Sequence, residues 1–518
     1  MVMDNLYRCE AEQVESGFSF DNETVRKALK RIYEKEFHPM TDIEENLFDS
    51  VWKTMNVATE KGFGAREADD PDFDFYRELR SNNAVFAAFK VHRAQNDMAA
   101  LLLDKNGNLK PFEQWAKEVM PIADHQMRRW LRTEYDTAII RAHQAADWRQ
   151  FEREKGILPN LKWMPSTSVH PGADHKMFWG TIRPVDDTFW DEHKPGDRWN
   201  CKCTLSATDE EQTNVPGSGP GDAPAPGLEN NPGKSARLFS DSHPYRKEAH
   251  PGAEKAVDRL TKRIREMIGE MPDNLTVQEK EAIVKNNLDI EKALKITKEK
   301  PMTVEEADKQ SANPKFVDEY ILDPKGRYTD KYGNRYSKNP DYKHTDEQYS
   351  INCQTCAPAY ALRLRGFNIT AKGKTDGSQL DYLSKGHAFE VWKNTDGTPA
   401  KHTSINSWLV AKGYQKMTPK RYWQFFNEVC KEEGVYELCI GWKGGSGHAT
   451  ILQRFANGEL RYIEPQHDNS KGSGYEWKNV KHLCERGASN SHSCRGIMRI
   501  DNKLFNTDFL GIFDIGGV

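Results

Sequence analysis

Apolar residues recur at helical spacing from residue 20 to residue 155, with polar residues filling the positions between them. A spacing of three or four positions predicts amphipathic helices that bury one face. In two early stretches the apolar residues share one face each: Val25, Leu29 and Ile32, then Ile43, Leu47 and Val51. A third stretch, residues 127–156, is longer and ends at Gly156, which predicts a long helix.

The helical spacing is lost between residues 157 and 205. This stretch is dense in Trp, His, Pro and Asp. No long helix fits the pattern, and the frequent turn-forming residues predict short strands and ordered loops. Four aromatic residues are candidates for a small core in this Trp/His/Cys-rich α+β module: Trp179, Phe189, Trp190 and Trp199.

Two shifts in composition divide the rest of the chain. Residues 208–252 are rich in Pro and Gly, which predicts a loose linker, because such a segment buries little apolar surface. Residues 253–311 are basic and predict a helical connector, and residues 312–518 form a separate globular unit. We therefore expect a multidomain α+β protein with a mostly helical N-terminal half, which begins with a helical region over residues 1–69.

Length, composition and charge narrow the function classes. A chain of 518 residues is too long for one core and predicts roughly three domains. Its first residues are polar and acidic, and it lacks a run of about 18 apolar residues, so neither a secretory signal nor a membrane span is expected. A net charge of −4 argues against a general nucleic-acid-binding protein. Nine cysteines, an odd number, predict reduced thiols rather than a disulfide framework.

The sequence NCQTCAPAYALRLRG, residues 352–366, carries the first candidate chemistry. Pro358 fits a first helical turn, so a helix is predicted to start near Thr355–Ala357, with Cys353 and Cys356 at its N-terminus. The free N–H groups and the dipole of a helix N-terminus favour a thiolate. Position alone does not choose between the two cysteines. Half of a zinc site is an alternative for this spacing, but no matching second half follows.

His448 is the candidate base for such a thiol, because glycines precede it and a strand–turn–strand pattern follows it. The pairing of that hairpin decides what lies beside the imidazole. A two-residue loop at Asn457–Gly458 would put His448 and Glu464 on opposite faces. A three-residue loop at Ala456–Gly458 would instead put Glu464 and Gln466 on the same face as His448.

The cysteine motif, followed by SGHATIL and LRYIEPQ, resembles the papain-fold toxin family, whose domains end many bacterial polymorphic toxins. The resemblance covers residues 312–518. It implies a papain-like α+β domain, in which a helix bearing the cysteine packs on an antiparallel sheet bearing the histidine. It assigns the nucleophile to Cys353, the base to His448 and the orienting acid to Glu464, next to Gln466. The family usually has Asp where this chain has Glu.

The same resemblance implies a cysteine hydrolase. It leaves open whether the enzyme cleaves peptide bonds or deamidates glutamine, because both routes pass through an acyl-enzyme. Backbone N–H groups at the helix start are expected to stabilise the oxyanion, and Gln354 is a candidate side-chain donor. Cys356 is then expected to pack behind the nucleophile.

A second resemblance lies further toward the N-terminus. RTEYDTAIIRAH and the Trp/His/Cys-rich stretch resemble the Mu F-like phage head morphogenesis family over residues 70–207. The matching features are, in order, Arg132–Glu134, His175, Gly180, Asp187 to Trp190, and Pro195 to Cys203. The resemblance implies a minor capsid protein near the portal vertex, present in few copies and entering the host with the DNA. Portal and capsid proteins are the implied partners.

Cys201 and Cys203, together with His170 or His175, are candidate zinc ligands within residues 165–205. A metal would stabilise a loop-rich module with few core residues. The C-x-C spacing is tight for one ion, and simple packing of the two cysteines is the alternative. Elsewhere the sequence implies no cofactor.

The two resemblances lead to one hypothesis: a phage or prophage minor capsid protein that carries a C-terminal cysteine hydrolase acting on a protein of the target cell. It predicts a place in the virion, and also in the cytoplasm of producing and recipient bacterial cells. A cognate immunity protein is a further expected partner, but a membrane or a specific nucleic acid is not. Two alternatives are a purely structural head protein with an inactive or binding-only C-terminal domain, and a capsid maturation protease.

Overall fold

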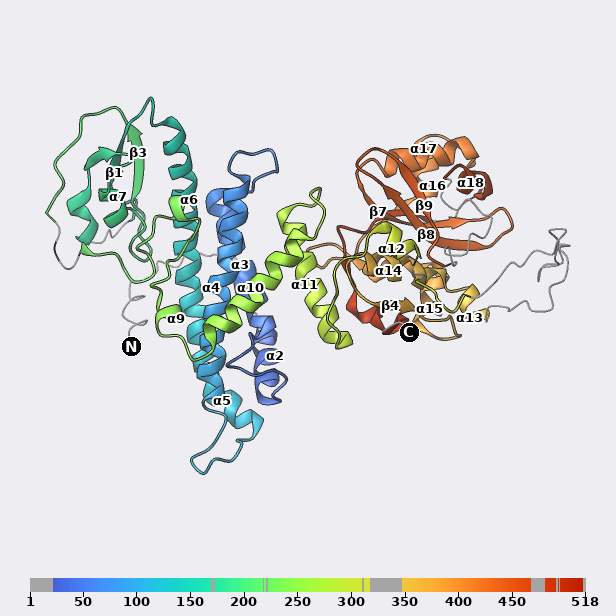
Figure 1. Cartoon of the computed structure of the whole chain (residues 1–518), viewed down its shortest axis with the longest axis horizontal. Helices are drawn as coiled ribbons and strands as arrows, with labels where there is room; N and C mark the ends of the chain where they lie inside the picture. The colour runs from blue at the N-terminus through green and yellow to red at the C-terminus, as the bar shows by residue number, and fades with distance from the viewer. Residues whose placement is uncertain are drawn as a thin grey trace. The chain divides into compact units, whose positions relative to one another are not determined.

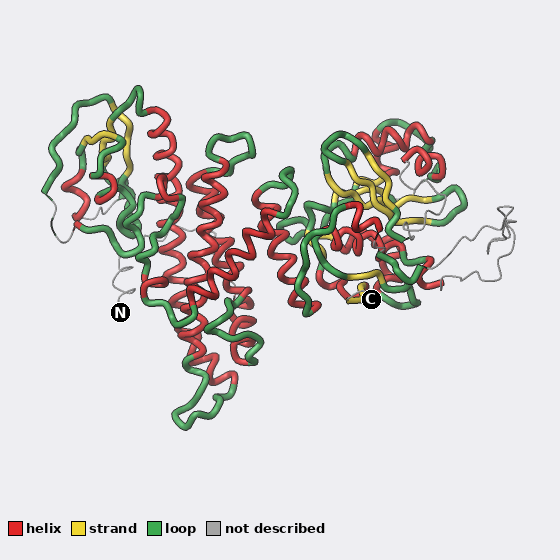
Figure 2. Tube along the Cα trace, viewed as in Figure 1, coloured by secondary structure: helices red, strands yellow, loops and turns green. Residues whose placement is uncertain are grey.

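The computed structural model describes residues 22–168, 173–217, 219, 222–309, 312–316, 347–466, 480–490, 492 and 494–515. The chain divides into two compact units, Met1–Glu266 and Met267–Val518 (Figure 1). The first unit is mostly helical, and the second combines helices with an antiparallel sheet (Figure 2). The multidomain α+β class predicted from the sequence is confirmed.

Helices with the predicted apolar faces form the core of the first unit. They are α2 (Asn22–Tyr33), α3 (Glu45–Phe63), α4 (Phe73–Ala99), α5 (Phe112–Asp124) and α6 (Leu131–Glu154), with the π-helical turn His125–Trp130 between α5 and α6. Helix α3 packs against α2, α4 and α6, and α3, α4 and α6 run side by side in Figure 1. The apolar residues of both predicted faces are buried. Among the described residues, no helix combines the length and the apolar character needed to cross a membrane.

A buried ion pair connects α4 to α6. The ammonium nitrogen of Lys90 lies 2.9 Å from Glu134 Oε2, and both side chains are fully buried. The Tyr245 hydroxyl donates to Glu134 Oε1 over 2.5 Å and accepts from Lys90 Nζ over 2.7 Å. Burial lowers the pKa of Lys90, and the charge of Glu134 opposes that shift. Each charge therefore depends on the other, since either one alone would be buried without compensation.

Replacing Lys90 with methionine should destabilise the first unit by about 3–5 kcal/mol, because Glu134 would become an unpaired buried charge. The double variant Lys90→Met/Glu134→Leu should recover much of that loss. Thermal unfolding of the full chain, together with hydrogen exchange of α4 and α6, measures both effects. Lys117→Met, at an exposed position of α5, is the matched control and should change little. An unchanged stability of Lys90→Met would contradict the argument.

A small antiparallel sheet follows α6. Its strands are β1 (Asn160–Met164), β2 (Ile182–Pro184) and β3 (Thr204–Thr208), in the order β2-β1-β3, with the short helices η2 (Ala173–Phe178) and α7 (Phe189–Glu192) between them. This confirms the short strands and loops predicted for residues 157–205. Its aromatic core contains Trp163, Phe178, Phe189 and Trp190, packed on Trp148 and Phe151 of α6. Trp199, expected in this core, instead stacks on Phe239 with ring centroids 5.7 Å apart.

Residues 222–252 are ordered, although their composition predicted part of a loose linker. Leu228 and Tyr245 are fully buried there. The physical reason is Arg141 of α6, whose buried guanidinium group donates to the backbone carbonyls of Leu228 over 3.1 Å and Asn230 over 2.7 Å. In a loose linker these carbonyl oxygens would bond to water. Here they accept hydrogen bonds from a buried guanidinium group instead. The segment also forms the short helices α8 (Pro232–Ser235) and α9 (Pro244–Lys247).

The second unit is built around a five-stranded antiparallel sheet with the order β6-β10-β7-β8-β9. The strands are β6 (Thr403–Ser404), β7 (Gly434–Gly441), β8 (Gly447–Arg454), β9 (Leu460–Ile463) and β10 (Gly496–Arg499). Helix α14 (Cys353–Leu364) packs against β7 and β8. Alternate residues of β7 serve two cores: Val435 and Cys439 pack with α14, whereas Leu438 and Ile440 pack with α17 (Pro419–Val429).

Of the elements that remain, the first begins in the first unit and ends in the second, and the others belong to the second unit. They are α10 (Ala253–Gly269), α11 (Val277–Leu294), α12 (Val304–Lys309), α13 (Glu347–Ser350), β4 (Ile369–Ala371), α15 (Gln379–Tyr382), η4 (Leu383–His387), η5 (Ala388–Val391), β5 (Trp392–Lys393), α16 (Ile405–Ala411), α18 (Val480–Arg486), β11 (Leu504–Phe505), η7 (Thr507–Ile512) and β12 (Phe513–Ile515). Asn286 of α11 exchanges two hydrogen bonds with the backbone of Phe505, of 2.8 and 2.9 Å. Helix α11, predicted as part of a connector, is therefore integral to the second unit.

Glu437 is a fully buried carboxyl group in the core between β7 and α14. The indole nitrogen of Trp392 donates to its Oε2 over 2.7 Å, and its Oε1 has no hydrogen-bond partner among the described residues. Burial raises the pKa of Glu437 to about 8, which the hydrogen bond from Trp392 only partly opposes. The group is therefore mostly protonated at neutral pH.

Because the pKa of Glu437 is raised on folding, the second unit should lose stability as the pH rises from about 4.5 to about 8. Glu437→Gln, which keeps the acceptor for Trp392, should remove that loss and stabilise the unit at pH 9 by roughly 3 kcal/mol. Hydrogen exchange of β7 across this pH range, corrected for intrinsic rates, measures the effect. Glu433→Gln, at an exposed position beside β7, should leave the pH dependence intact. Parallel pH profiles for Glu437→Gln and the native chain would contradict the assignment.

Candidate functional site

The start of α14 positions both cysteines of the NCQTC motif. The Asn352 carbonyl accepts from the backbone N–H groups of Thr355 over 2.9 Å and Cys356 over 3.2 Å, so the first turn begins at Cys353. The predicted start near Thr355–Ala357 is therefore too late. Pro358 lies inside the helix, past the first turn, where it makes no hydrogen bond to the Gln354 carbonyl.

Three buried amide side chains hold this helix start. Asn352 Nδ2 donates to Asn313 Oδ1 over 3.1 Å and to the Lys372 carbonyl over 3.0 Å. Gln466 Nε2 donates to Asn352 Oδ1 over 3.2 Å, and Asn313 Nδ2 donates to the Gln466 carbonyl over 3.1 Å. The network joins residues 312–316, α14 and the chain beyond β9. Our sequence analysis missed Asn313, because a lone Asn between polar stretches gives no signal of its own.

The two cysteines differ in their surroundings. Cys356 is fully buried, and its thiol donates to the Asn352 carbonyl with a sulfur–oxygen distance of 3.3 Å. Burial, followed by the charges of Cys353 and Glu464, raises the pKa of Cys356 well above its usual value. Cys353 is 5% exposed and lies 3.3 Å from Gln354 Oε1, which accepts from its thiol. Cys356 is thus held as a neutral packing thiol, and the side chain of Gln354, the predicted oxyanion donor, lies beside the Cys353 sulfur.

The β8–β9 hairpin has the three-residue loop. Ile451 pairs with Ile463 and Leu452 with Tyr462, so paired residue numbers sum to 914 as that alternative requires. Gly458 closes the loop with φ +83°, a conformation that favours glycine. The same register brings Glu464 to the face of His448.

Glu464 is the side chain that contacts the imidazole. Its Oε2 lies 2.6 Å from His448 Nε2 and also accepts from the Tyr462 hydroxyl over 2.7 Å. Its Oε1 accepts from the backbone N–H of Gln466 over 3.1 Å. Of the two candidates for orienting the ring, Glu464 makes the contact, while the Gln466 side chain binds Asn352. Both oxygens of a 1% exposed carboxylate are held, so the extra methylene of Glu is accommodated.

The pKa of His448 depends on both Glu464 and Cys353. Burial lowers the pKa of His448, but the Glu464 charge and hydrogen bonding with Cys353 and Glu464 outweigh it and raise that pKa to about 10. With Nε2 held by Glu464, Nδ1 is the ring nitrogen left for the sulfur. The arrangement therefore favours a protonated imidazole between a carboxylate and a thiol.

The β7–β8 turn leaves this site accessible at one side. Residues 443–447 are exposed, and three of these five are glycines. The Trp442 ring stacks on the His448 ring with centroids 5.6 Å apart. The imidazole itself is only 9% exposed, and the small, exposed residues beside it allow a polypeptide to approach closely.

A second cluster of donor atoms lies in the first unit. His175 Nδ1 is 3.1 Å from Cys201 Sγ and 3.8 Å from Cys203 Sγ, and the three donor atoms all lie within 4.8 Å of one another. His175 Nε2 is 2.7 Å from Asp197 Oδ1. The hydrogen bond from Cys201, with further ones from His175, Trp163 and Trp179, lowers the pKa of Cys203 to about 4. His170, the other predicted donor, lies outside the described residues.

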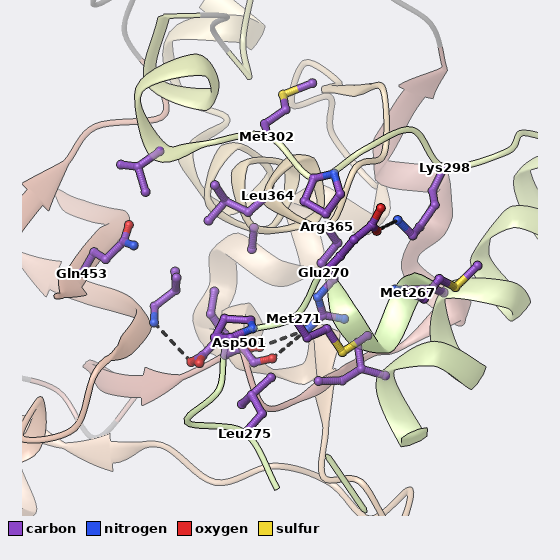
Figure 3. Close-up of a pocket in the computed structure, with 18 residues that line it drawn as sticks. Met267, Glu270, Met271, Leu275, Lys298, Met302, Leu364, Arg365, Gln453 and Asp501 are labelled. Carbon is purple, nitrogen blue, oxygen red and sulfur yellow. Dashed lines mark hydrogen bonds and ion pairs between the residues drawn. The ribbon is translucent and has the colours of Figure 1, made fainter. Parts of the chain in front are cut away.

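An apolar cavity of about 250 Å³ lies at the other end of α14 (Figure 3). Met267, Met271, Leu275, Met302 and Leu364 contribute its apolar wall. Glu270 and Lys298 form an ion pair of 2.8 Å at its edge, and Arg365 and Asp501 also line it. None of the predicted site residues lines this cavity, so it is separate from the Cys353–His448 pair.

Comparison with known proteins finds a family for part of the first unit. Residues 106–206 match the family model of phage Mu protein F like protein. The match ends within one residue of the predicted boundary at 207 and begins later than residue 70. This Mu F-like domain contains α5, α6 and the small sheet, and with them His175, Cys201 and Cys203. No curated protein and no solved structure is significantly similar to the chain.

Proposed function

We propose that the protein is a minor phage head component whose second unit is a papain-like cysteine hydrolase. The Mu F-like domain at residues 106–206 supports the head assignment, with capsid and portal proteins as partners and the virion as location. The hydrolase proposal is carried by one observation: Cys353 lies at the N-terminus of α14 beside His448, an imidazole that Glu464 holds at 2.6 Å and whose pKa Glu464 and Cys353 both raise.

The residues support a two-step reaction. A protonated imidazole beside the sulfur favours the Cys353 thiolate, which attacks the carbonyl carbon of an amide. The carbon–sulfur bond forms first and gives a tetrahedral intermediate, and the amide carbon–nitrogen bond then breaks as His448 transfers its proton to the leaving nitrogen. Water then attacks the thioester and gives a proton to His448, the carbon–sulfur bond breaks, and the acid leaves while the Cys353 thiolate and the imidazolium are restored. Glu464 keeps the ring oriented throughout.

Backbone N–H groups at the first turn of α14 are the candidate oxyanion donors. The N–H groups of the first residues of a helix have no acceptor within the helix and point toward its N-terminal end. A tetrahedral intermediate formed at Cys353 would carry its negative oxygen close to them. The network of Asn313, Asn352 and Gln466 fixes the position of this turn.

The experiment must test whether the second unit cleaves peptide bonds or deamidates glutamine. The full chain and a Cys353→Ala variant are incubated with bacterial extract, and proteins are compared by mass spectrometry. New chain termini in the native sample alone indicate a peptidase, and glutamines converted to glutamates indicate a deamidase. Identical products from both samples would overturn the hydrolase proposal and favour a structural or binding-only second unit. Products confined to capsid proteins would favour a maturation protease.

A further inference from the structure

The C-x-C pair of the Mu F-like domain converges with a histidine from a distant part of the chain. His175 belongs to η2, and Cys201 and Cys203 immediately precede β3. Cys203 and His175 are buried, and Cys201 is partly exposed. Folding therefore brings three donor atoms from separate segments within 4.8 Å of one another.

The distances suit one tetrahedral metal ion. Zinc binds sulfur at about 2.3 Å and imidazole nitrogen at about 2.0–2.1 Å, so neighbouring donors around it lie roughly 3.5–3.8 Å apart. Of the two nitrogen–sulfur distances here, 3.8 Å lies at the upper end of that range and 3.1 Å lies below it. An ion would therefore need the Cys201 sulfur to move away from Nδ1 by about half an ångström. Thiolate and imidazole donors are the set that zinc prefers.

Asp197 and the groups that bind it hold the His175 ring in a fixed orientation. Asp197 is 1% exposed, and its Oδ1 lies 2.7 Å from His175 Nε2. A carboxylate on Nε2 fixes the tautomer that leaves the Nδ1 lone pair directed at the sulfurs. The backbone N–H of Lys194 and the Arg198 guanidinium, at 3.3 and 3.0 Å, hold the same carboxylate.

Two indole groups point to the same conclusion independently. The N–H groups of Trp163 and Trp179 are buried and have no hydrogen-bond partner among the described residues, and both residues pack in the same cluster as Cys203. Trp163 is fully buried, so its N–H is an orphaned donor. Orphaned donors in this cluster would be satisfied by a sulfur that carries negative charge, as a metal-bound thiolate does.

We infer that His175, Cys201 and Cys203 bind one zinc ion, which joins η2 to the start of β3. Among the described residues no fourth His, Cys, Asp or Glu belongs to the group. The ion would stabilise a module whose sheet has only three short strands.

Metal content of the purified full chain tests this inference directly. Elemental analysis should find about one zinc ion per chain, and His175→Ala, Cys201→Ser and Cys203→Ser should each lose it. Cys430→Ala, a buried cysteine of the second unit, is the control and should retain it. Replacing zinc with cobalt should produce thiolate-to-metal charge transfer and the visible bands of a tetrahedral site, both absent from Cys201→Ser.

Asp197→Asn keeps the three ligands and provides a test that does not depend on losing one of them. It should still bind zinc, but with an affinity about 10–100-fold lower in competition with a chelator. Two results would overturn the inference. One is a native chain that binds neither zinc nor cobalt above the level of the cysteine variants. The other is a Cys201–Cys203 disulfide in the freshly purified protein.

Discussion

Replacing Cys353 with alanine is expected to lower the hydrolase activity of the full chain by about 10⁴-fold or more, because the nucleophile itself is removed. His448→Ala should have a loss of similar size, and the double variant should be little worse than either single one. Such non-additivity is expected when residues act as a unit, and it would not result from two independent structural defects. The measurement is the rate of product formation on the substrate found by mass spectrometry.

Cys356→Ala separates the two cysteines that lie at the start of the same helix. Because Cys356 is fully buried and bonds only to the Asn352 carbonyl, its loss should cost stability and leave the chemical step nearly intact. Cys430→Ala, in the other core of the same unit, controls for the loss of any buried thiol. If Cys356→Ala were inactive and Cys353→Ala active, the assignment of the nucleophile would be wrong.

Glu464→Gln is expected to lower the turnover rate by about 10²–10⁴-fold while leaving the fold intact. The amide replaces a carboxylate that holds Nε2 at 2.6 Å, so it no longer stabilises the imidazolium and can favour the wrong tautomer. An Asp at this position, the residue usual in the family that the motif resembles, would have to reach further by one methylene. Glu464→Asp should therefore retain more activity than Glu464→Gln.

The pH dependence provides a readout that a purely structural role would not change. His448 has a pKa raised to about 10: burial lowers it, but the charge of Glu464 and hydrogen bonding with Cys353 outweigh that effect. Activity that needs the imidazolium should thus decline only as the pH approaches 10 in the native chain. Without the Glu464 charge the pKa falls, so the alkaline limb of Glu464→Gln should move to lower pH.

The raised pKa of His448 also makes the stability of the second unit depend on pH, and the stability it contributes falls at alkaline pH as the activity does. It is fully present below the unfolded value near 6.5 and is lost as the pH rises through about 10. Glu459→Gln changes an exposed carboxylate of the same hairpin and should shift neither profile. An alkaline limb at the same pH in Glu464→Gln and the native chain would contradict the contact between Glu464 and the ring as its cause.

Local patterns in the sequence determined the elements of this protein and the residues worth testing. The periods of the apolar residues predicted α2, α3 and α6, since a helix or strand must bury one face wherever it packs. The NCQTC motif and the hairpin pattern identified Cys353, His448 and Glu464 as candidates, and the C-x-C pair with its nearby histidine identified the donor cluster. These signals are short in range, and each depends on residues close together in the chain.

Only the tertiary structure decided the choices that involve distant partners. It showed Cys356 fully buried against the Asn352 carbonyl, selected the three-residue loop, and brought Glu464 rather than Gln466 against the ring. It also revealed Asn313, and it ordered a Pro/Gly-rich segment around the buried Arg141. Composition and spacing do not predict which carbonyl, amide or charged group from a distant part of the chain will contact a given residue. Burial and hydrogen bonding between such groups depend on packing, so they were decided only when the chain folded.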